Sequence, residues 1–286
     1  LKFSVSVIFG CKLLADFFSK MGASESAARL TLVDTGVLVC SHSNKNGSTG
    51  IGAGAMLRND GILYLAGNKG LAVMDTVTPA ETKRIGDVID TGALSYEGGS
   101  DLIMHSNLLY VAGGNGLVVL DTECSKLQPI LMWLAIDTGA ISYDGGVAMA
   151  IKKNMSVMYV AGGKGLAVMS IADPRAPERV GKVIETGALA QSTTGVAMLL
   201  LQEESIMYIS GGKGLAVFDI SDPMKPWRIG DVIDTGALAY SGGAAMVAKE
   251  DVLYIAGGGG LAVFSLADIR KPSRVGSVID TGCLSY

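Results

Sequence analysis

The sequence predicts an all-β fold: a single β-propeller whose blades each contain four strands. First, the tripeptide Asp-Thr-Gly recurs along the chain. Its copies begin at Asp34, Asp90, Asp137, Asp234 and Asp280, and Glu185-Thr186-Gly187 is an altered copy. Second, a Tyr- and Gly-containing motif recurs with almost the same spacing, as in "LYLAGNKGLAVMD" (63–75) and "MYISGGKGLAVFD" (207–219). Third, the apolar runs are short and show no helical periodicity.

The composition agrees with this fold. The chain has 286 residues, including 39 Gly and 7 Pro, and it is 49% hydrophobic but only 6% aromatic. An aliphatic chain with many Gly and few Pro is typical of short strands joined by tight turns. Because all-β propellers often form one domain of more than about 200 residues, we expect residues 1–286 to form a single domain.

Residues 145–187 illustrate how one unit is built. Its four apolar runs are "VAMAI" (147–151), "VMYVA" (157–161), "LAVMSI" (166–171) and "VGKVIE" (180–185). The "GGKG" between the second and third runs predicts a hairpin turn, because Gly adopts positive φ without steric cost. The Pro-containing "ADPRAPER" predicts a turn before the fourth run. Four strands in about 47 residues correspond to one propeller blade.

The units divide the chain into five regular repeats and one irregular segment. The regular repeats cover residues 53–282. The segment "FGCKLLADFFSKMGASESAARLTLVDTG" (9–36) aligns with residues 210–236 if one residue is inserted before its Asp-Thr-Gly. The matched pairs are Gly10 with Gly211, Lys12 with Lys213, Leu14 with Leu215, Ala15 with Ala216 and Phe17 with Phe218. We therefore expect six blades, with residues 1–36 as a degenerate first blade, rather than five.

A leader peptide is the alternative interpretation of the N-terminal segment. Its apolar run is interrupted by Lys12 and Asp16 and is shorter than the ~20 residues that a membrane-spanning helix needs. We expect no membrane span in this chain.

The repeat pattern "LYxAGGxGLAVxDISDPxxPxxVGxxxTG" resembles the LVIVD repeat, and residues 207–236 are its best copy. The resemblance implies a β-propeller. It also implies a scaffold or adhesion-type module of secreted or cell-surface proteins, without shared catalytic residues. The second unit departs from the pattern, because "DTECSKLQPILMWLAIDTG" replaces the Asp-Pro turn.

Asp-Thr-Gly is also the catalytic tripeptide of aspartic proteases. That chemistry needs two carboxylates that lie about 3 Å apart and share one proton. Equivalent Asp residues of successive blades would stand around a ring, too far apart for this. We expect each Asp to accept a backbone N–H as an Asx turn, with Gly allowing the sharp change of direction. The "AGGKG" loops are likewise expected to be hairpin turns, because no helix follows to bind a phosphate.

One face of the propeller is a candidate partner-binding surface. The hairpin turns and the connections between blades are expected to emerge on the same face. This face would carry Tyr96, Tyr143 and Tyr240, the acidic residues Glu97 and Asp144, and the turn residues Lys69, Lys164 and Lys213. Tyr beside charge is a composition suited to recognition. The alternative is that each Tyr packs on Gly-Gly and each Lys is solvated.

The expected function is a non-catalytic scaffold or protein-interaction module, such as an accessory subunit of a larger assembly or a surface protein. The acidic and basic residues recur with the repeat and do not converge, so we expect no enzyme, no cofactor and no metal. The alternative is a propeller that binds or hydrolyses a small molecule or glycan at its central channel. Only Asp101 and His105 break the apolar pattern of the first strands there.

The remaining features restrict partners and location. The net charge is −4 and basic residues do not cluster, so nucleic acid is not an expected partner, whereas other proteins are. The four Cys permit either redox compartment. Asn46 and Asn154 are glycosylation sites if the chain enters a eukaryotic secretory pathway. A location outside the cytoplasm is favoured.

Overall fold

The fold was analysed in a computed structural model of the chain. The structure describes residues 54–67, 69–94, 98–123, 125, 127–142, 145–152, 155–189, 195–201, 203–238 and 243–281. These residues form five four-stranded antiparallel sheets, and their only helical element is the single-turn 3₁₀ helix η1 (Pro79–Glu81). The all-β propeller prediction is confirmed. Among the described residues, no helix is long and apolar enough to cross a membrane.

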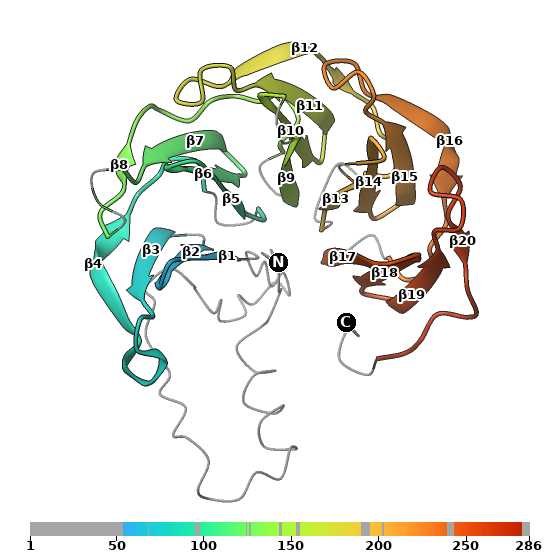
Figure 1. Cartoon of the computed structure of the whole chain (residues 1–286), viewed down its shortest axis with the longest axis horizontal. Helices are drawn as coiled ribbons and strands as arrows, with labels where there is room; N and C mark the ends of the chain where they lie inside the picture. Colours follow the sequence, from blue (N-terminus) through green and yellow to red (C-terminus); the bar gives the residue numbers. More distant parts are fainter. Residues whose placement is uncertain are drawn as a thin grey trace, which may run out of the picture.

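Each sheet is one blade, and its strands follow the chain order from the centre outwards (Figure 1). Blade 1 contains β1 (Ala55–Asn59), β2 (Ile62–Gly67), β3 (Gly70–Asp75) and β4 (Lys83–Ile89). Blade 2 contains β5 (Asp101–His105), β6 (Leu108–Gly113), β7 (Gly116–Asp121) and β8 (Ile130–Leu131). Blade 3 contains β9 (Val147–Lys152), β10 (Val157–Gly162), β11 (Gly165–Ser170) and β12 (Glu178–Ile184). Blade 4 contains β13 (Ala197–Leu201), β14 (Ile206–Gly211), β15 (Gly214–Asp219) and β16 (Trp227–Ile233). Blade 5 contains β17 (Ala244–Lys249), β18 (Val252–Gly257), β19 (Gly260–Ser265) and β20 (Ser273–Arg274).

The blades stand side by side in an arc around a common centre. The first strands line this centre, and β1 neighbours β5, β5 neighbours β9, β9 neighbours β13 and β13 neighbours β17. Among the described strands, β1 and β17 do not approach each other in the same way, so the arc is open between blade 1 and blade 5 (Figure 1). The predicted sixth, degenerate blade at residues 1–36 lies outside the described residues.

The expected hairpins form between the second and third strands. In blade 3, Gly162 pairs with Gly165, which leaves a two-residue turn. Gly165 has φ +138°, and a Cβ there would overlap the backbone of Ile184 on the fourth strand. Only Gly, which has no Cβ, allows the two backbones to come this close. The predicted fourth run also forms a strand, but β8 and β20 contain only two residues each.

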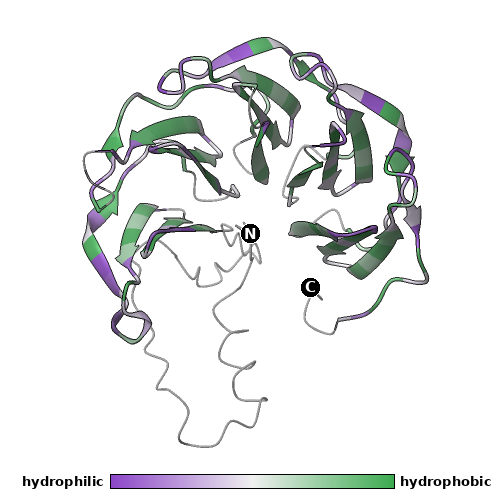
Figure 2. Cartoon of the chain, in the orientation of Figure 1, coloured by the Kyte–Doolittle hydropathy of each residue, from purple (hydrophilic) through white to green (hydrophobic). Residues whose placement is uncertain are grey.

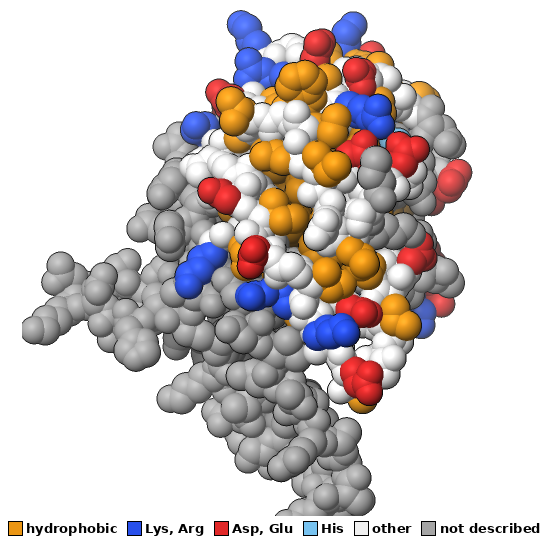
Figure 3. Space-filling model, turned by 90° about the vertical axis from the view of Figure 1, so that its left-hand side faces the viewer, with side chains coloured by type: hydrophobic (Ala, Val, Ile, Leu, Met, Phe, Trp, Pro, Cys, Tyr) orange, Lys and Arg blue, Asp and Glu red, His pale blue; other side chains and the backbone are white. Residues whose placement is uncertain are grey.

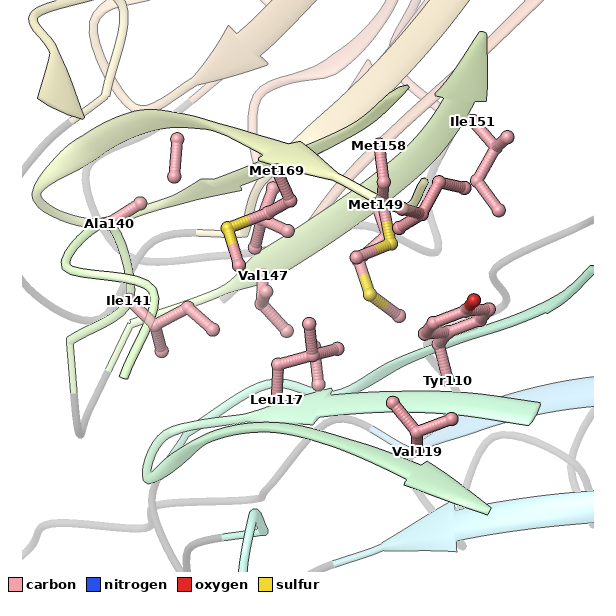
Figure 4. Packing of buried hydrophobic residues seen from close by; sticks show 14 of the residues in the cluster. Tyr110, Leu117, Val119, Ala140, Ile141, Val147, Met149, Ile151, Met158 and Met169 are labelled. Carbon is pink, nitrogen blue, oxygen red and sulfur yellow. The ribbon is translucent and has the colours of Figure 1, made fainter. Parts of the chain in front are cut away.

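The core lies between the blades rather than inside any one sheet. Between blades 2 and 3, Tyr110, Leu117 and Val119 pack against Met149, Met158 and Met169 (Figure 4). The inner strands are apolar on both faces, whereas the outer strands carry most of the polar residues (Figure 2). Fully burying one large aliphatic side chain contributes about 1.5–3 kcal/mol, so these interfaces stabilise the ring with few aromatic residues.

Polar contacts also join neighbouring blades. The hydroxyl of Tyr110 donates to the carbonyl of Pro174 (2.7 Å), that of Tyr159 to Pro223 (3.0 Å) and that of Tyr208 to Ile269 (2.6 Å). Each acceptor lies in the turn before the fourth strand of the next blade. Ion pairs cross two of the same boundaries. Arg175 pairs with Asp121 (3.0 Å) and Glu123 (3.3 Å), and Arg270 pairs with Asp219 (2.6 Å).

Candidate functional site

Three of the Asp-Thr-Gly tripeptides, those at Asp90, Asp137 and Asp234, form turns between blades, as the sequence predicted. Asp137 Oδ1 accepts the backbone N–H of Gly139 at 2.8 Å, and Gly139 has φ +73°. Asp90 and Asp234 make the same contact to Gly92 (3.0 Å) and Gly236 (2.9 Å). All three Asp residues are exposed, and each carboxylate is occupied within its own turn. These carboxylates therefore have a structural role in Asx turns.

The hairpin turns lie beside the connections between blades. The backbone N–H of Lys164 donates to Ala140 O (2.9 Å) and that of Lys213 to Ala188 O (3.0 Å), and both Ala residues directly follow a turn between blades. The side chains of Lys69, Lys164 and Lys213 are exposed. The other residues of the predicted partner-binding face lie outside the described residues. They are Tyr96, Glu97, Tyr143, Asp144 and Tyr240, and the glycosylation candidates Asn46 and Asn154 also lie outside.

Asp101 is the one irregular acidic residue on the inner strands. Strand pairing places it opposite Ala112, a position that Ala55, Ala148, Ala197 and Ala245 occupy in the other blades. Its Oδ2 accepts the N–H of Met149 on β9 at 2.6 Å, and its Oδ1 accepts that of Leu102 at 2.8 Å. Burial raises the pKa of this carboxyl to about 7, although the two backbone hydrogen bonds oppose the shift. Asp101 thus links two inner strands and titrates near neutral pH.

His105 does not converge with Asp101 to form a site. It ends β5, opposite Leu108, whereas Asp101 begins the strand. In the described part of the chain, no group of three or more His, Cys, Asp or Glu residues could hold a metal ion. The inner strands therefore show one isolated carboxyl rather than a catalytic constellation.

The fourth strand of blade 2 differs from those of the other blades. Strand pairing aligns Leu131 with Arg84, Arg179, Arg228 and Arg274. The next residues, Trp133 and Leu134, replace a Gly and a polar residue. The Gly positions are Gly86, Gly181, Gly230 and Gly276, and the polar positions are Asp87, Lys182, Asp231 and Ser277. At these two positions, blade 2 therefore has large apolar residues, whereas the other four described blades have a Gly and a polar residue.

These substitutions create an outer apolar patch, which we define as Leu127, Ile130, Trp133 and Leu134. The four side chains are 43%, 55%, 57% and 87% exposed, respectively. Hydrophobic side chains gather on this side of the molecule, along blades 1 and 2 (Figure 3). A groove of about 220 Å³ adjoins the patch at Leu127 and lies between β4 and residues 127–129. Its lining is mostly apolar but includes Asp87 and Gln128, and consists of Val73, Ile85, Gly86, Asp87, Val88, Ile89, Leu127, Gln128 and Pro129. Leu127 belongs to both the patch and the lining of the groove, so we take the two together as one candidate binding surface.

This surface was not predicted from the sequence, although the signal was present. The stretch "DTECSKLQPILMWLAIDTG" departs from the repeat, but no binding surface was inferred from it. An alignment of the fourth strands shows that Trp133 takes the position of a Gly in each of the other four repeats. What the sequence could not show is that this strand is the exposed outer edge of its blade.

Comparison with known proteins supports the fold and the repeat. The LVIVD repeat model matches residues 99–132 and 203–234. None of the curated proteins matches the sequence. The fold and these matches define the class of protein as a β-propeller. More specifically, two segments of this propeller match the LVIVD repeat, as the sequence resemblance indicated.

Several solved structures share the fold at low sequence identity. A protein from Lactobacillus plantarum is 12% identical with a TM-score of 0.57, over 79% of this chain and 70% of that chain. A candidate 6-phosphogluconolactonase from Bacteroides uniformis is 11% identical with a TM-score of 0.62, over 79% and 70%. The periplasmic gluconolactonase of Pseudomonas aeruginosa is 8% identical with a TM-score of 0.58, over 81% and 72%.

These matches overturn the prediction that the chain is not an enzyme. The prediction took repeat regularity without a catalytic constellation to mean a non-catalytic protein. Two propellers with this strand arrangement bear the names of lactone-hydrolysing enzymes. Regular repeats are therefore compatible with catalysis in this architecture. At these identities, the likeness shows the shared fold and does not assign an activity.

Proposed function

We propose that this propeller is a protein-interaction module whose binding surface is the outer apolar patch together with the adjoining groove. The observation that supports this proposal comes from comparing the five described blades. Only blade 2 has large apolar residues at the two positions where the repeat has a Gly followed by a charged or polar residue. Within a repeat protein, the other blades show what the fold itself requires. The fold therefore does not require Trp133 and Leu134 at these positions.

The exposed residues are suited to binding a protein. Contiguous exposed apolar surface favours association because its burial removes that surface from water. Trp is among the residues that contribute most to protein interfaces, and Trp133 is 57% exposed. β8 is the outermost strand of its blade, and the edge of an outermost strand can pair with an extended segment. A partner segment with apolar side chains fits both features.

The test exchanges the patch residues for those of the other blades. The double variant Trp133→Gly, Leu134→Asp carries the Gly-Asp sequence found at residues 86–87. We expect a partner that co-purifies with the native chain to be lost from this variant, as measured by quantitative mass spectrometry. Trp227→Ser is the matched control, because Trp227 is similarly exposed on the outer strand of blade 4 (53%). Equal recovery of the partner with all three proteins would refute the proposed surface.

The second candidate function is binding or hydrolysis of a small molecule, such as a sugar lactone, at the centre of the ring. Two fold neighbours have lactonase names, and Asp101 supplies an inner-strand carboxyl with a pKa near 7, suited to general acid–base chemistry. The test is proton release from glucono-δ-lactone. Activity in the native chain that Asp101→Asn abolishes would support this function, whereas no rate above the spontaneous reaction would exclude this substrate.

The predicted face with Tyr96, Tyr143 and Tyr240 stays a proposal for a second interaction surface. Its support is that the exposed Lys164 and Lys213 lie on hairpin turns that contact the connections between blades. Unchanged partner binding after substitution of the three Tyr residues by Ala would contradict it. The location outside the cytoplasm also stays a prediction.

A further inference from the structure

Blade 5 has an apolar sheet face that is only partly buried. Along β18 and β19, buried residues alternate with more exposed ones, whereas β10 and β14 of blades 3 and 4 are buried at every position. The incompletely buried face contains Val247, Tyr254 and Val263, which strand pairing places in one row across the sheet. Val247 is 51% exposed and Tyr254 is 38% exposed.

The sequence of blade 5 is suited to burial on both faces. Its "VLYIAGGGGLAVFS" (252–265) is as apolar as "VMYVAGGKGLAVMS" (157–170) in blade 3. In blades 3 and 4, the face that carries Tyr159 and Tyr208 is buried against the next blade. An alternating strand with one solvated face would carry polar residues on that face. The face around Tyr254 therefore has the composition of a blade interface.

Within the described ranges, Tyr254 also differs from its equivalents in its hydrogen bonding. Tyr110, Tyr159 and Tyr208 each donate to a carbonyl in the turn before the fourth strand of the following blade. Among the described residues, the hydroxyl of Tyr254 has no such acceptor. The side chain is thus placed to donate across an interface for which the described chain provides no further blade.

We propose that residues 9–36 of this chain dock on the Tyr254 face of blade 5 and occupy the opening between blades 5 and 1. Ala262 and Phe264 of blade 5 belong to the cluster that packs on the Tyr208 face of blade 4. In the repeat alignment, Ala15 and Phe17 occupy the same register positions as this pair. Residues 9–36 therefore contain the two apolar residues with which a following blade would pack on the Tyr254 face.

The chain order favours the same occupant. In the described chain, each turn between blades leads from the fourth strand of one blade to the first strand of the next. Asp34-Thr35-Gly36 also precedes β1, although over a longer connection, so the segment before it would stand next to blade 1, on the side away from blade 2. That position lies at the opening of the arc (Figure 1). A second copy of the chain is the competing occupant.

Photocrosslinking from position 254 distinguishes these occupants. Benzoylphenylalanine replaces Tyr254 in the full chain, and crosslinked peptides are identified by mass spectrometry. We expect a monomeric product in which position 254 is joined to a peptide within residues 9–36. The same probe at position 208 is the positive control and should reach the turn around Ile269. A dimeric product, or no crosslink from position 254 while the control succeeds, would overturn the proposal.

Hydrogen exchange tests the register of the docked segment. Phe17→Asp would place a charge against the Tyr254 face, and we expect the amides of β18 and β19 to exchange at least about tenfold faster. Phe18→Asp is the matched control. The residues aligned with Phe18 in the described blades are all polar, namely Asp75, Asp121, Ser170, Asp219 and Ser265. Because this position accepts polar residues, we expect Phe18→Asp to leave the exchange of β18 and β19 unchanged. Equal effects of the two variants, or no effect of Phe17→Asp, would refute this register.

Discussion

The hydroxyl of Tyr159 in blade 3 donates a hydrogen bond of 3.0 Å to the carbonyl of Pro223 in blade 4. The two residues are 64 positions apart, and Tyr110 makes the same contact to Pro174 over the same separation. A fully buried phenol needs a partner for its hydroxyl. The repeat meets this need by placing the turn of each following blade over the Tyr of the preceding one.

The first prediction concerns this contact. Tyr159→Phe removes the donor and leaves the carbonyl of Pro223 without it. A net contribution of about 0.5–1.5 kcal/mol is usual for one hydrogen bond, so the free energy of unfolding should fall by about 1 kcal/mol. Chemical denaturation measures the change. An unchanged midpoint and slope would show that the contact contributes nothing to stability.

The second prediction concerns tyrosine ionisation. Burial raises the pKa of Tyr64, Tyr110 and Tyr208 to about 12, and burial together with the charge of Asp222 raises that of Tyr159. We expect these four phenols to remain protonated at pH 11 in the folded chain, as measured by ultraviolet absorbance. Because the phenolates form more readily in the unfolded chain, stability should fall as the pH rises above 10. Complete ionisation before unfolding would contradict this prediction.

The third prediction concerns Asp101. Its pKa rises from 3.8 to about 7 on folding, so the folded chain binds this proton more tightly than the unfolded chain. The contribution of Asp101 to stability is therefore greatest below pH 4 and is lost as the pH rises towards 7. Between pH 5 and pH 8, this group should lower the free energy of unfolding by about 2–3 kcal/mol.

Asp101→Asn tests this effect, because Asn has nearly the same shape but does not titrate. Chemical denaturation at pH 5 and pH 8 should show a smaller loss of stability in the variant than in the native chain. A constant offset between the two proteins is expected in addition, since an amide nitrogen cannot accept the N–H of Met149. Parallel pH dependences would show that Asp101 is not responsible.

The fourth prediction concerns the glycine of a turn between blades. Gly139 has φ +73°, and a Cβ there would overlap the guanidinium of Arg179, which donates to Thr138 O at 3.3 Å. Gly181 has nearly the same φ, +71°, but no neighbouring atom within 4 Å of such a Cβ. Both substitutions by Ala carry a strain of about 1–2 kcal/mol from positive φ. Gly139→Ala should be the more destabilising by at least about 1 kcal/mol, as measured by denaturation, because the Arg179 contact is also lost. Equal losses would show that Arg179 adapts without cost.

The fifth prediction concerns the outer apolar patch. Trp133 and Trp227 are the two Trp residues of the chain, so Trp227→Phe leaves Trp133 as the sole indole reporter. Binding of a partner at the patch should remove Trp133 from water and shift its fluorescence to shorter wavelength. The reciprocal variant Trp133→Phe should show no such shift. A shift that follows Trp227 instead would place the partner on blade 4.

The propeller fold could be predicted from the amino-acid sequence alone, because the fold depends on local rules that repeat. Apolar runs, hairpin glycines and Asx turns recur in every described unit, and each can be recognised without distant contacts. The structural role of Asp90, Asp137 and Asp234 was predictable for the same reason, since each carboxylate contacts an amide two residues away. The degenerate segment at residues 1–36 stays a prediction.

Features that depend on neighbouring blades could not be predicted and became visible only in the folded chain. Asp101 looked like a thin channel site in the sequence, but its carboxyl bridges β5 to Met149 of β9 and is partly buried. Trp133 looked like part of a variant turn, but it lies on the outer edge of blade 2 and stays exposed. Tyr254 matched its equivalents in sequence, yet its face is only partly buried. Burial is decided by which sheet covers which, and that arrangement exists only once the blades are placed around the ring.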